Sequence, residues 1–542
     1  MAQKHTLEEL NNCSREELIT IVLMMQGQLD ALNDNIEKLI EQVRIANNYR
    51  FGKHTETLKS IEGQLSFFDE AEAACDESKK EPSAEEVLPA KRTVKKKGQR
   101  DLDLKDFPEE ILPPYSVSEE QLDAFYGKNN WRRMPDETYK RLRHEPESWT
   151  VEIHTVEVYV GTDGDHQDEF LRGNRPRDLL RNSIVTPSLL ASILNVKYVN
   201  SSALHRIEQE FQRNGVNISR QTMSNWIVKC SQMYFTPFVE RMKQELLSLH
   251  VTQSDETPTQ VIADSDHPNS KCYMWVHRSG EFYTRRPIVI YEYQKGRDHQ
   301  KPLDFYKDYK GILVTDSLQQ YHLVDKKLAD VTNANCWAHA RRDFADAVKA
   351  ADKKDPSSVR QSAAYQALQK IAEFYNADTE LKELSSKERL QKRQELIKPM
   401  VEEVFAWVKQ QASDCTVPPK SKTGHGLNFV INQEKYLRVF LEDGDVPIDN
   451  SASEKAIRTF CLGKKNWMFH NTAKGASASA MVYSISETAK LNNLRPYYYF
   501  KYILTELPKL CDEKGNIDPA KLDHLMPWSD SLPDKCRKPR RP

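Results

Sequence analysis

The segment 250–261, HVTQSDETPTQV, places the acidic pair Asp255 and Glu256 between two hydroxyl-rich flanks. Two structures fit these residues. The pair could form a surface turn, where Asp is favoured, or it could end a buried strand and present a carboxylate to a metal ion. The local sequence does not decide between them, so the neighbouring segments must.

Three short strand patterns follow one another around this pair, in SLHVTQSDE, KCYMWVHRSGEF and RRPIVIYEYQ. A polar helical stretch near GRDHQKPLDFYKDY comes next, and then an apolar run in KGILVTDSLQQYH that ends at Asp316. A further strand near VTNANCWAHA leads into a helix that contains Arg341 and Arg342. This order predicts a mixed sheet with covering helices, with Asp255 and Asp316 at or just past the ends of core strands.

Two carboxylates that converge from different strands suit Mg²⁺, a hard cation that takes few protein ligands and leaves room for phosphate oxygens. A pair of such ions about 3.5–4 Å apart activates the attacking oxygen and stabilises the leaving one. A third carboxylate is usual in this chemistry. The candidate is Glu454 in VPIDNSASEKAIRTFCLGKKNWMFHN, in the first turns of a helix that begins near Asn450 or Ser451.

Purely structural roles also fit these acids. Each Asp could cap a turn, Ser451 and Glu454 have the spacing of a capping box, and Glu454 with Arg458 forms an ordinary i,i+4 pair. Asp449 or Glu487 could also be the third acid. These alternatives remain open from the pattern alone.

Residues 201–230, SSALHRIEQEFQRNGVNISRQTMSNWIVKC, contain two short helical patterns. Gly215 suits a left-handed helix end, and Ser219 suits the N-cap of the next helix. This spacing is typical of a helix-turn-helix, although an ordinary helical hairpin fits equally. In a helix-turn-helix, three side chains of the second helix would face a DNA groove: Arg220, Gln221 and Asn225.

A heptad pattern occupies residues 18–43. Apolar side chains recur every seven residues in two series, and such a narrow stripe favours a parallel coiled-coil dimer over one amphipathic helix packed on its own domain. The predicted d positions are Leu18, Met25, Leu32 and Leu39, and the predicted a positions are Val22, Leu29, Ile36 and Val43.

The composition sets further limits. The chain of 542 residues is 29% charged and 39% apolar, with a net charge of −2, and its length predicts several domains. We find no apolar run of about 18 residues and no signal-peptide core, so we expect a cytoplasmic protein without a membrane contact. The nine cysteines form no Cys-x-x-Cys pair, which argues against a disulfide framework or a Cys-rich zinc site.

Several of these segments, in this order, resemble the insertion-sequence-66 family of bacterial DDE transposases. The core segments are SDETPTQV, LVTDSLQQYH, NCWAHARRDF and DNSASEKAIRTFCLGKKNWMF, and YSISETAKLNNLRPYYYFKYILTELP is similar to the C-terminal segment of that family. FGKHTE and ISRQTMSNW are also similar to family elements. The resemblance covers most of the chain and implies an RNase H-like catalytic core.

The resemblance implies that Asp255, Asp316 and Glu454 are the three catalytic, metal-binding acids. It implies two Mg²⁺ ions, with Mn²⁺ as a substitute, that promote cleavage at the element end and strand transfer of the freed 3′ hydroxyl to target DNA. No covalent protein intermediate is needed. Further DNA contacts are expected from basic residues and one indole, although solvated charges and a core aromatic fit too: Arg341, Arg342, Arg458, Lys464, Lys465 and Trp467.

The chain departs from the family pattern at two places. Asp449-Asn450-Ser451 replaces the usual Asp-Asn-Asn, a mild change because Ser caps a helix as well as Asn does. Residues 101–175 contain no Cys, whereas family members commonly carry a Cys-x-x-Cys segment there, so we expect no zinc. Cys336 and His339 are too few for a metal site and are interpreted as structural.

These observations predict a multidomain α+β protein that binds double-stranded DNA at element ends and target, and that forms a homodimer, with small accessory proteins as further partners. A catalytically silent dimeric DNA-binding protein and an RNase H-like nuclease are the alternatives. The predicted parts are a coiled-coil helix (1–60), a charged linker (61–100), a small mixed domain (101–175), a helix-turn-helix region (176–244), two core parts (245–345 and 445–482), a helical insertion between them (346–444), and a C-terminal helical segment with a basic tail (483–542).

Overall fold

The computed structural model describes residues 177–264, 271–298, 300–351, 356–413 and 417–539, the strands β1 (Val158–Val160) and β2 (Phe170–Arg172), and three single residues, 15, 26 and 149. The two short strands pair antiparallel and lie within residues 101–175, where a small mixed domain is predicted. The predicted coiled-coil positions from Leu18 to Val43 and the charged linker lie outside the described residues.

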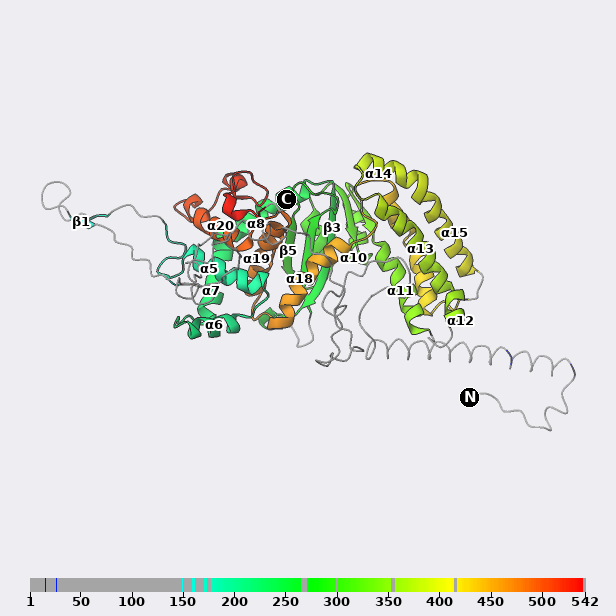
Figure 1. Ribbon diagram of the computed structural model, residues 1–542, viewed down its shortest axis with the longest axis horizontal. Coiled ribbons are helices and arrows are strands. Elements are labelled where there is room, and N and C mark those ends of the chain that lie inside the picture. The colour runs from blue at the N-terminus through cyan, green and yellow to red at the C-terminus, as the bar shows by residue number, and fades with distance from the viewer. Residues whose placement is uncertain are drawn as a thin grey trace, which may run out of the picture. The chain divides into compact units, whose positions relative to one another are not determined.

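A five-stranded mixed sheet forms the centre of the unit that contains residues 177–538 (Figure 1). Its strand order is β5-β4-β3-β6-β7, in which β4 is antiparallel to both of its neighbours, and β6 is parallel to both of its own. The mixed α+β prediction is confirmed, and each predicted core strand is present. The strands are β3 (Val251–Thr259), β4 (Cys272–Ser279), β5 (Val289–Gln294), β6 (Gly311–Thr315) and β7 (Val331–Asn335).

The register of β3 and β6 brings Asp255 and Asp316 to the same level of the sheet. Gln253 lies opposite Val314, and each acid follows two residues later in its chain. The prediction that Asp255 lies at or just past a strand end is wrong for β3 itself. This strand pairs with β4 along Thr252–Thr259, and Asp255 lies inside that range. Asp255 lies beyond the last residue of β3 that pairs with β6. The strand nevertheless continues past this point, because β4 still pairs with it there.

Helices cover the outer edge of the sheet at β5. The amide of Tyr291 donates to the Ser484 hydroxyl at 2.8 Å, and the amide of Val289 donates to the Thr488 hydroxyl at 3.0 Å. Both hydroxyls lie on α19 (Ala473–Leu491), so this helix satisfies backbone groups that an edge strand would expose. The neighbouring helices are α5 (Pro187–Leu194), α6 (Leu204–Arg213), α7 (Arg220–Cys230), α8 (Thr236–Leu247) and α20 (Pro496–Leu510).

The described residues between β7 and the helix that carries Glu454 are helical. They pack around an apolar cluster in which the Trp337 ring contacts Phe374 and Phe405. Two side chains of the sheet, Val314 and Ala334, belong to the same cluster. The helices are α11 (Trp337–Ala350), α12 (Pro356–Gln361), α13 (Ala363–Glu380), α14 (Ser386–Lys392), α15 (Lys398–Ser413), α16 (Lys422–Asn432) and α17 (Glu434–Leu437). None of the described helices is long and apolar enough to cross a membrane.

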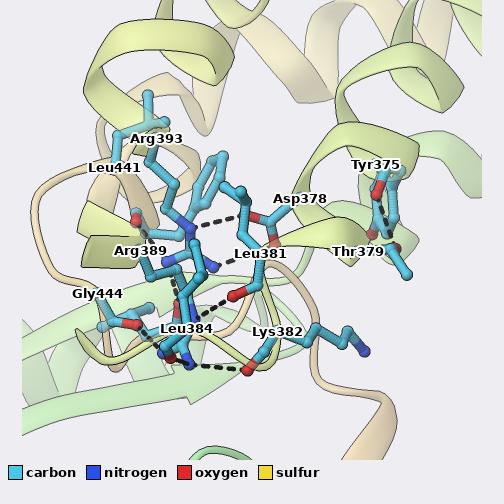
Figure 2. Close-up of polar contacts among 12 residues, drawn as sticks. Tyr375, Asp378, Thr379, Leu381, Lys382, Leu384, Arg389, Arg393, Leu441 and Gly444 are labelled. Atoms are coloured by element: carbon cyan, nitrogen blue, oxygen red, sulfur yellow. Dashed lines mark hydrogen bonds and ion pairs between the residues drawn. The ribbon is translucent and has the colours of Figure 1, made fainter. Parts of the chain in front are cut away.

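Two buried arginines join these helices to the chain that leads back to the sheet (Figure 2). Arg393 is fully buried and binds Asp378 with Nε–Oδ1 and Nη2–Oδ2 distances of 2.7 and 3.1 Å. Its Nη1 donates to the carbonyls of Phe440 and Val446. Arg389 donates to the Gly444 carbonyl at 2.6 Å. The segment that precedes Glu454 is therefore held by charge-assisted hydrogen bonds, which are stronger than neutral ones.

Replacing Arg393 with Met should lower the free energy of unfolding by about 3–5 kcal/mol, because Asp378 would stay buried without its cation. Urea unfolding at neutral pH measures this. The double variant Arg393→Met/Asp378→Leu should recover much of the loss, since it removes both charges together. Arg360→Met, at an exposed position, is the matched control. Equal stability of the single variant and wild type would contradict the assigned role.

Candidate active site

Three acidic side chains come together from three separate elements. Asp255 lies inside β3, Asp316 directly follows β6, and Glu454 lies in the first turn of α18 (Ser451–Trp467). Burial first, and then the charge of Asp316, raise the pKa of Asp255 well above its usual value, and Glu256 and Glu454 add to this. Burial, and then the charge of Glu256, raise the pKa of Asp316 to about 7. Asp255 is therefore close enough to both Asp316 and Glu454 for their charges to disfavour its ionisation.

Asn450 fixes the helix of Glu454 to the strand of Asp255. It is fully buried, and its Nδ2 donates to the Ser254 carbonyl at 2.8 Å, while its Oδ1 accepts from Gln253 Nε2 at 3.2 Å. Its backbone amide also lies 3.1 Å from Cys336 Sγ, at the start of α11. Sequence reasoning missed this role, because the bonds join residues 196 and 197 positions apart.

The capping-box interpretation of Ser451 and Glu454 is wrong. Asn450 is the N-cap of α18, Ser451 already lies within the helix, and the Asn450 side chain bonds to β3 instead of to the first turn. Asp449, considered as a third acid, accepts a hydrogen bond from the Ser451 amide at 2.9 Å. The helix therefore begins against the sheet, and its first turn presents Glu454 near Asp255.

Glu256, beside Asp255 on β3, has partners of its own. Its Oε1 accepts from Arg297 Nε, and its Oε2 accepts from the Tyr321 hydroxyl, both at 2.6 Å. Successive residues of a strand point to opposite faces of the sheet, so the Asp255-Glu256 pair divides between two environments. Sequence reasoning did not identify Arg297 and Tyr321 as partners of Glu256. The only available signal was that side chains alternate between the two faces of a strand, which places Glu256 on the opposite face from Asp255.

His339 and Arg342 of α11 lie on another side of Glu454. His339 Nδ1 is 3.9 Å from Glu454 Oε1 and has no hydrogen-bond partner, and Nε2 is 3.0 Å from Arg342 Nη2. Burial, and then the Arg342 charge, lower the pKa of His339 to about 3, so the ring is neutral at physiological pH. The interpretation of His339 as structural takes no account of this contact with the third acid.

The donor chemistry of this site suits a hard cation. The described residues contain no group of three or more His, Cys, Asp or Glu side chains already arranged around a common point for a metal ion. The three acids nevertheless supply only oxygen donors, and the raised pKa values of Asp255 and Asp316 indicate an unfavourable concentration of buried negative charge. A divalent cation of the Mg²⁺ type would relieve that repulsion and prefers such ligands.

The predicted DNA-contacting residues near the site have varied surroundings. The Arg341 guanidinium lies 6.0 Å from the centre of the Tyr375 ring. Lys464 Nζ donates to the Pro258 carbonyl at 2.5 Å, and Lys465 is exposed. The Trp467 indole lies 4.2 Å from Lys197 Nζ, next to the rings of Tyr198 and Tyr483. Glu487, an alternative third acid, pairs with Lys490 on α19 at 2.7 Å.

The helix pair α6 and α7 has the predicted turn. Gly215 has a φ of +76°, which an L side chain rarely adopts. The Ser219 hydroxyl accepts from the Thr222 amide at 3.2 Å, so Ser219 is the predicted N-cap. The three predicted groove-facing side chains are exposed on α7: Arg220, Gln221 and Asn225. Contact of these side chains with DNA stays a prediction.

Comparison with known proteins finds two family matches. Residues 182–478 match the model described as the transposase IS66 family, and residues 484–528 match the IS66 C-terminal element. The uncharacterized protein y4hP of Sinorhizobium fredii is 24% identical over 508 residues, which cover 92% of this chain and 88% of that protein. The uncharacterized protein y4qI of the same organism is 27% identical over 376 residues, 67% of this chain and 66% of y4qI, so the chain spans just under two thirds of it.

The pKa of Asp316 predicts a pH dependence of stability in metal-free buffer. The folded protein keeps a proton up to about pH 7, whereas an unfolded chain releases it near about pH 4. The free energy of unfolding should therefore fall as the pH rises between these values. Asp316→Asn should be more stable than wild type at pH 8 by about 2 kcal/mol, less than the full shift because the residue is partly exposed.

Urea unfolding in EDTA at pH 5 and pH 8 measures this difference. Asp530→Asn makes the same change at an exposed position and should leave the profile as in wild type. A wild-type stability that rises between the two pH values, with no gain in Asp316→Asn, would contradict the crowding of the carboxylates.

Proposed function

The chain belongs to the IS66 transposase family, and from this premise we propose that it cleaves DNA at element ends and joins the freed ends to target DNA. The proposed catalytic residues are Asp255, Asp316 and Glu454. The observation that carries the proposal is the convergence of these three acids, from a strand, a strand end and a helix: burial and neighbouring charges raise the pKa values of Asp255 and Asp316, and Glu454 is one of the charges that act on Asp255. Such perturbed groups concentrate at active sites.

The sheet supports an RNase H-like core for this activity. Along the chain, its first three strands pair antiparallel in sequence, and the fourth and fifth add in parallel on the other side of the first. Asp255 on the first strand and Asp316 after the fourth are then neighbours through the parallel pairing of β3 and β6. We propose that the helices between β7 and α18 are an insertion that separates the second acid from the third in sequence only.

The proposed reaction is phosphoryl transfer. A water oxygen attacks the phosphorus at the element end, and the 3′ oxygen leaves as a 3′ hydroxyl. This 3′ hydroxyl then attacks a phosphorus of the target strand, and the target's own 3′ oxygen leaves, so that one P–O bond breaks as another forms. Asp255, Asp316 and Glu454 would hold Mg²⁺ or Mn²⁺, which lowers the pKa of water and offsets the negative charge that develops.

The other residues of the site hold these acids in place. Asn450 keeps Glu454 at the level of Asp255. Arg297 and Tyr321 hold the carboxylate of Glu256, whose charge acts on Asp316. The chain itself therefore supplies a fixed arrangement of carboxylates before DNA binds.

Several other parts of the chain are proposed to bind DNA or a second copy. The helix pair α6 and α7 would read a groove, and Arg341, Arg342 and the basic residues of α18 would contact phosphates. A coiled coil at residues 18–43 would bring two copies together, as the joining of two ends requires. Small accessory proteins are possible further partners of this assembly.

Glu454→Gln should reduce cleavage of a duplex that carries the element end by about a hundredfold or more, as expected when a group that acts in the transition state is lost. Asp255→Ala and Asp316→Ala should do the same, and EDTA should abolish cleavage by wild type. Glu487→Gln is the matched control, because it makes the same change in the alternative third acid.

The products of this assay separate the alternatives. Cleavage with strand transfer supports a transposase, and cleavage without transfer supports an RNase H-like nuclease. Binding without cleavage by wild type supports a catalytically silent DNA-binding protein. Full activity of Glu454→Gln together with loss of activity in Glu487→Gln would move the third acid to α19.

Replacing Arg220 and Asn225 together with Ala should weaken binding to the element end by about tenfold or more, and should have little effect on unrelated DNA, because base-edge contacts carry sequence preference. Gel-shift titration at fixed salt measures both affinities. Lys229→Ala changes another exposed residue of the same helix and should affect both DNAs equally. An equal loss on both DNAs in the double variant would exclude base readout by α7.

A further inference from the structure

Four exposed apolar side chains gather at the C-terminal end of α18. Met468 and Phe469 directly follow this helix and are 65% and 43% exposed. Leu462, on its last turns, is 49% exposed. Ile262 is 53% exposed and lies beside them, since its amide donates to the His470 carbonyl at 3.0 Å. Contiguous exposed apolar groups of this kind mark contact surfaces.

Met468 and Phe469, here called the apolar finger, are held out by a strained turn. Met468 has φ and ψ of 67° and −50°, and the Phe469 amide donates to the Trp467 carbonyl at 2.8 Å. This is the rare γ-turn with positive φ, which is unfavourable for a residue with a side chain. Strain of this kind persists where the surroundings impose it, and it is concentrated at functional sites.

The residues on both sides of the finger impose this turn. Trp467 packs against Gly463 so tightly that a Cβ there would lie 2.1 Å from the indole ring. On the other side, His470 is buried, and its amide donates to the Gln260 carbonyl at 2.9 Å. With both flanks fixed, the two side chains between them have no place in the core and point to solvent.

The described residues that neighbour the finger in sequence carry mainly positive charge. Lys464 and Lys465 lie on the last turn of α18, and Lys474 is exposed on the first turn of α19. The acidic residue nearest to Ile262 in sequence, Asp264, already accepts from the Tyr293 hydroxyl at 2.6 Å and pairs with Lys295 at 3.7 Å. An apolar tip among cations suits a polyanion with flat apolar faces, which describes a nucleic acid strand.

The finger and the third acid share one helix. Fourteen positions separate Glu454 from Met468, which corresponds to about 21 Å at roughly 1.5 Å per residue. A DNA strand advances about 3.4 Å per nucleotide, so a strand along α18 would place the finger about six nucleotides from the acid. Within a paired duplex the base faces are covered by stacking, whereas an unpaired base offers a free face to Phe469.

We infer that the apolar finger Met468–Phe469 stacks on an unpaired base of the DNA strand that lies along α18. This inference rests on the proposed function, because it takes DNA as the substrate. It adds a binding site for a single-stranded or opened segment about six nucleotides from the site of cleavage, and it predicts that the protein prefers DNA with an unpaired arm to a fully paired duplex.

The test compares two DNAs with the full chain: a blunt duplex, and the same duplex with a short unpaired arm. Wild type should bind the arm-bearing DNA more tightly by about tenfold, the scale of one base stacked on an aromatic ring. Met468→Ser/Phe469→Ser should lose this preference and bind the blunt duplex as wild type does. Leu396→Ser is the matched control, because Leu396 is 52% exposed on another helix.

A second variant separates stacking from folding. Met468→Gly/Phe469→Ser keeps the backbone turn, because Gly adopts positive φ without strain, so its melting temperature should equal or exceed that of wild type. Its preference for the unpaired arm should nevertheless fall.

Three results would overturn the inference. Wild type could show no preference for the unpaired arm, or the double Ser variant could keep the preference unchanged. A changed sedimentation coefficient in that variant with unchanged DNA binding would instead assign the finger to self-association. Failure of wild type to bind either DNA would instead refute the proposed function itself.

Discussion

Mutual repulsion among buried carboxylates is the constraint that the rest of the structure must overcome. Asp255 and Asp316 both have raised pKa values, because burial and neighbouring acids disfavour their charged forms. Assembling such groups lowers stability unless other contacts compensate for it. The compensation comes from contacts distant in sequence, of which the Asn450 bonds to β3 and the Arg393 bonds to the Phe440 and Val446 carbonyls are the clearest. Both act on the chain that leads into α18, so they set the position of the third acid.

The adjacent acids Asp255 and Glu256 show how one strand can serve two purposes. Their side chains leave opposite faces of β3, and Glu256 reaches Arg297 and Tyr321, whereas Asp255 is surrounded by the charges of Asp316, Glu256 and Glu454, which raise its pKa. The charge of Glu256 is thus stabilised by a guanidinium and a hydroxyl. Burial and neighbouring acids instead disfavour the charged form of Asp255. Its position inside β3 answers the question of turn or strand that the local sequence leaves open.

Local patterns predicted local structure well in this chain. The apolar run before Asp316 predicted β6, and Gly215 and Ser219 predicted the end of one helix and the start of the next, because each depends on the conformational preferences of a few residues. The capping box at Ser451 was wrong for a different reason. Asn450 bonds to a strand almost two hundred residues earlier, and that bond, not the spacing of Ser and Glu, determines where α18 begins. The burial of Arg393 and the partners of Glu256 likewise depend on packing that no short pattern contains.

The length of α18 gives the proposed site a constant distance between Glu454 and the finger, which a flexible loop could not supply. The helix holds Glu454 against the sheet at one end and the strained turn at Met468 at the other. A helix is stiff over this length, so the separation between acid and finger stays nearly constant while DNA moves. A strand that is gripped at the finger would therefore be positioned at the acids as well, and reactants held in the right geometry need less entropy loss to react. In the proposed function, strain at Met468 would be the cost of a fixed distance between the finger and the acids, from which one phosphodiester among many is selected.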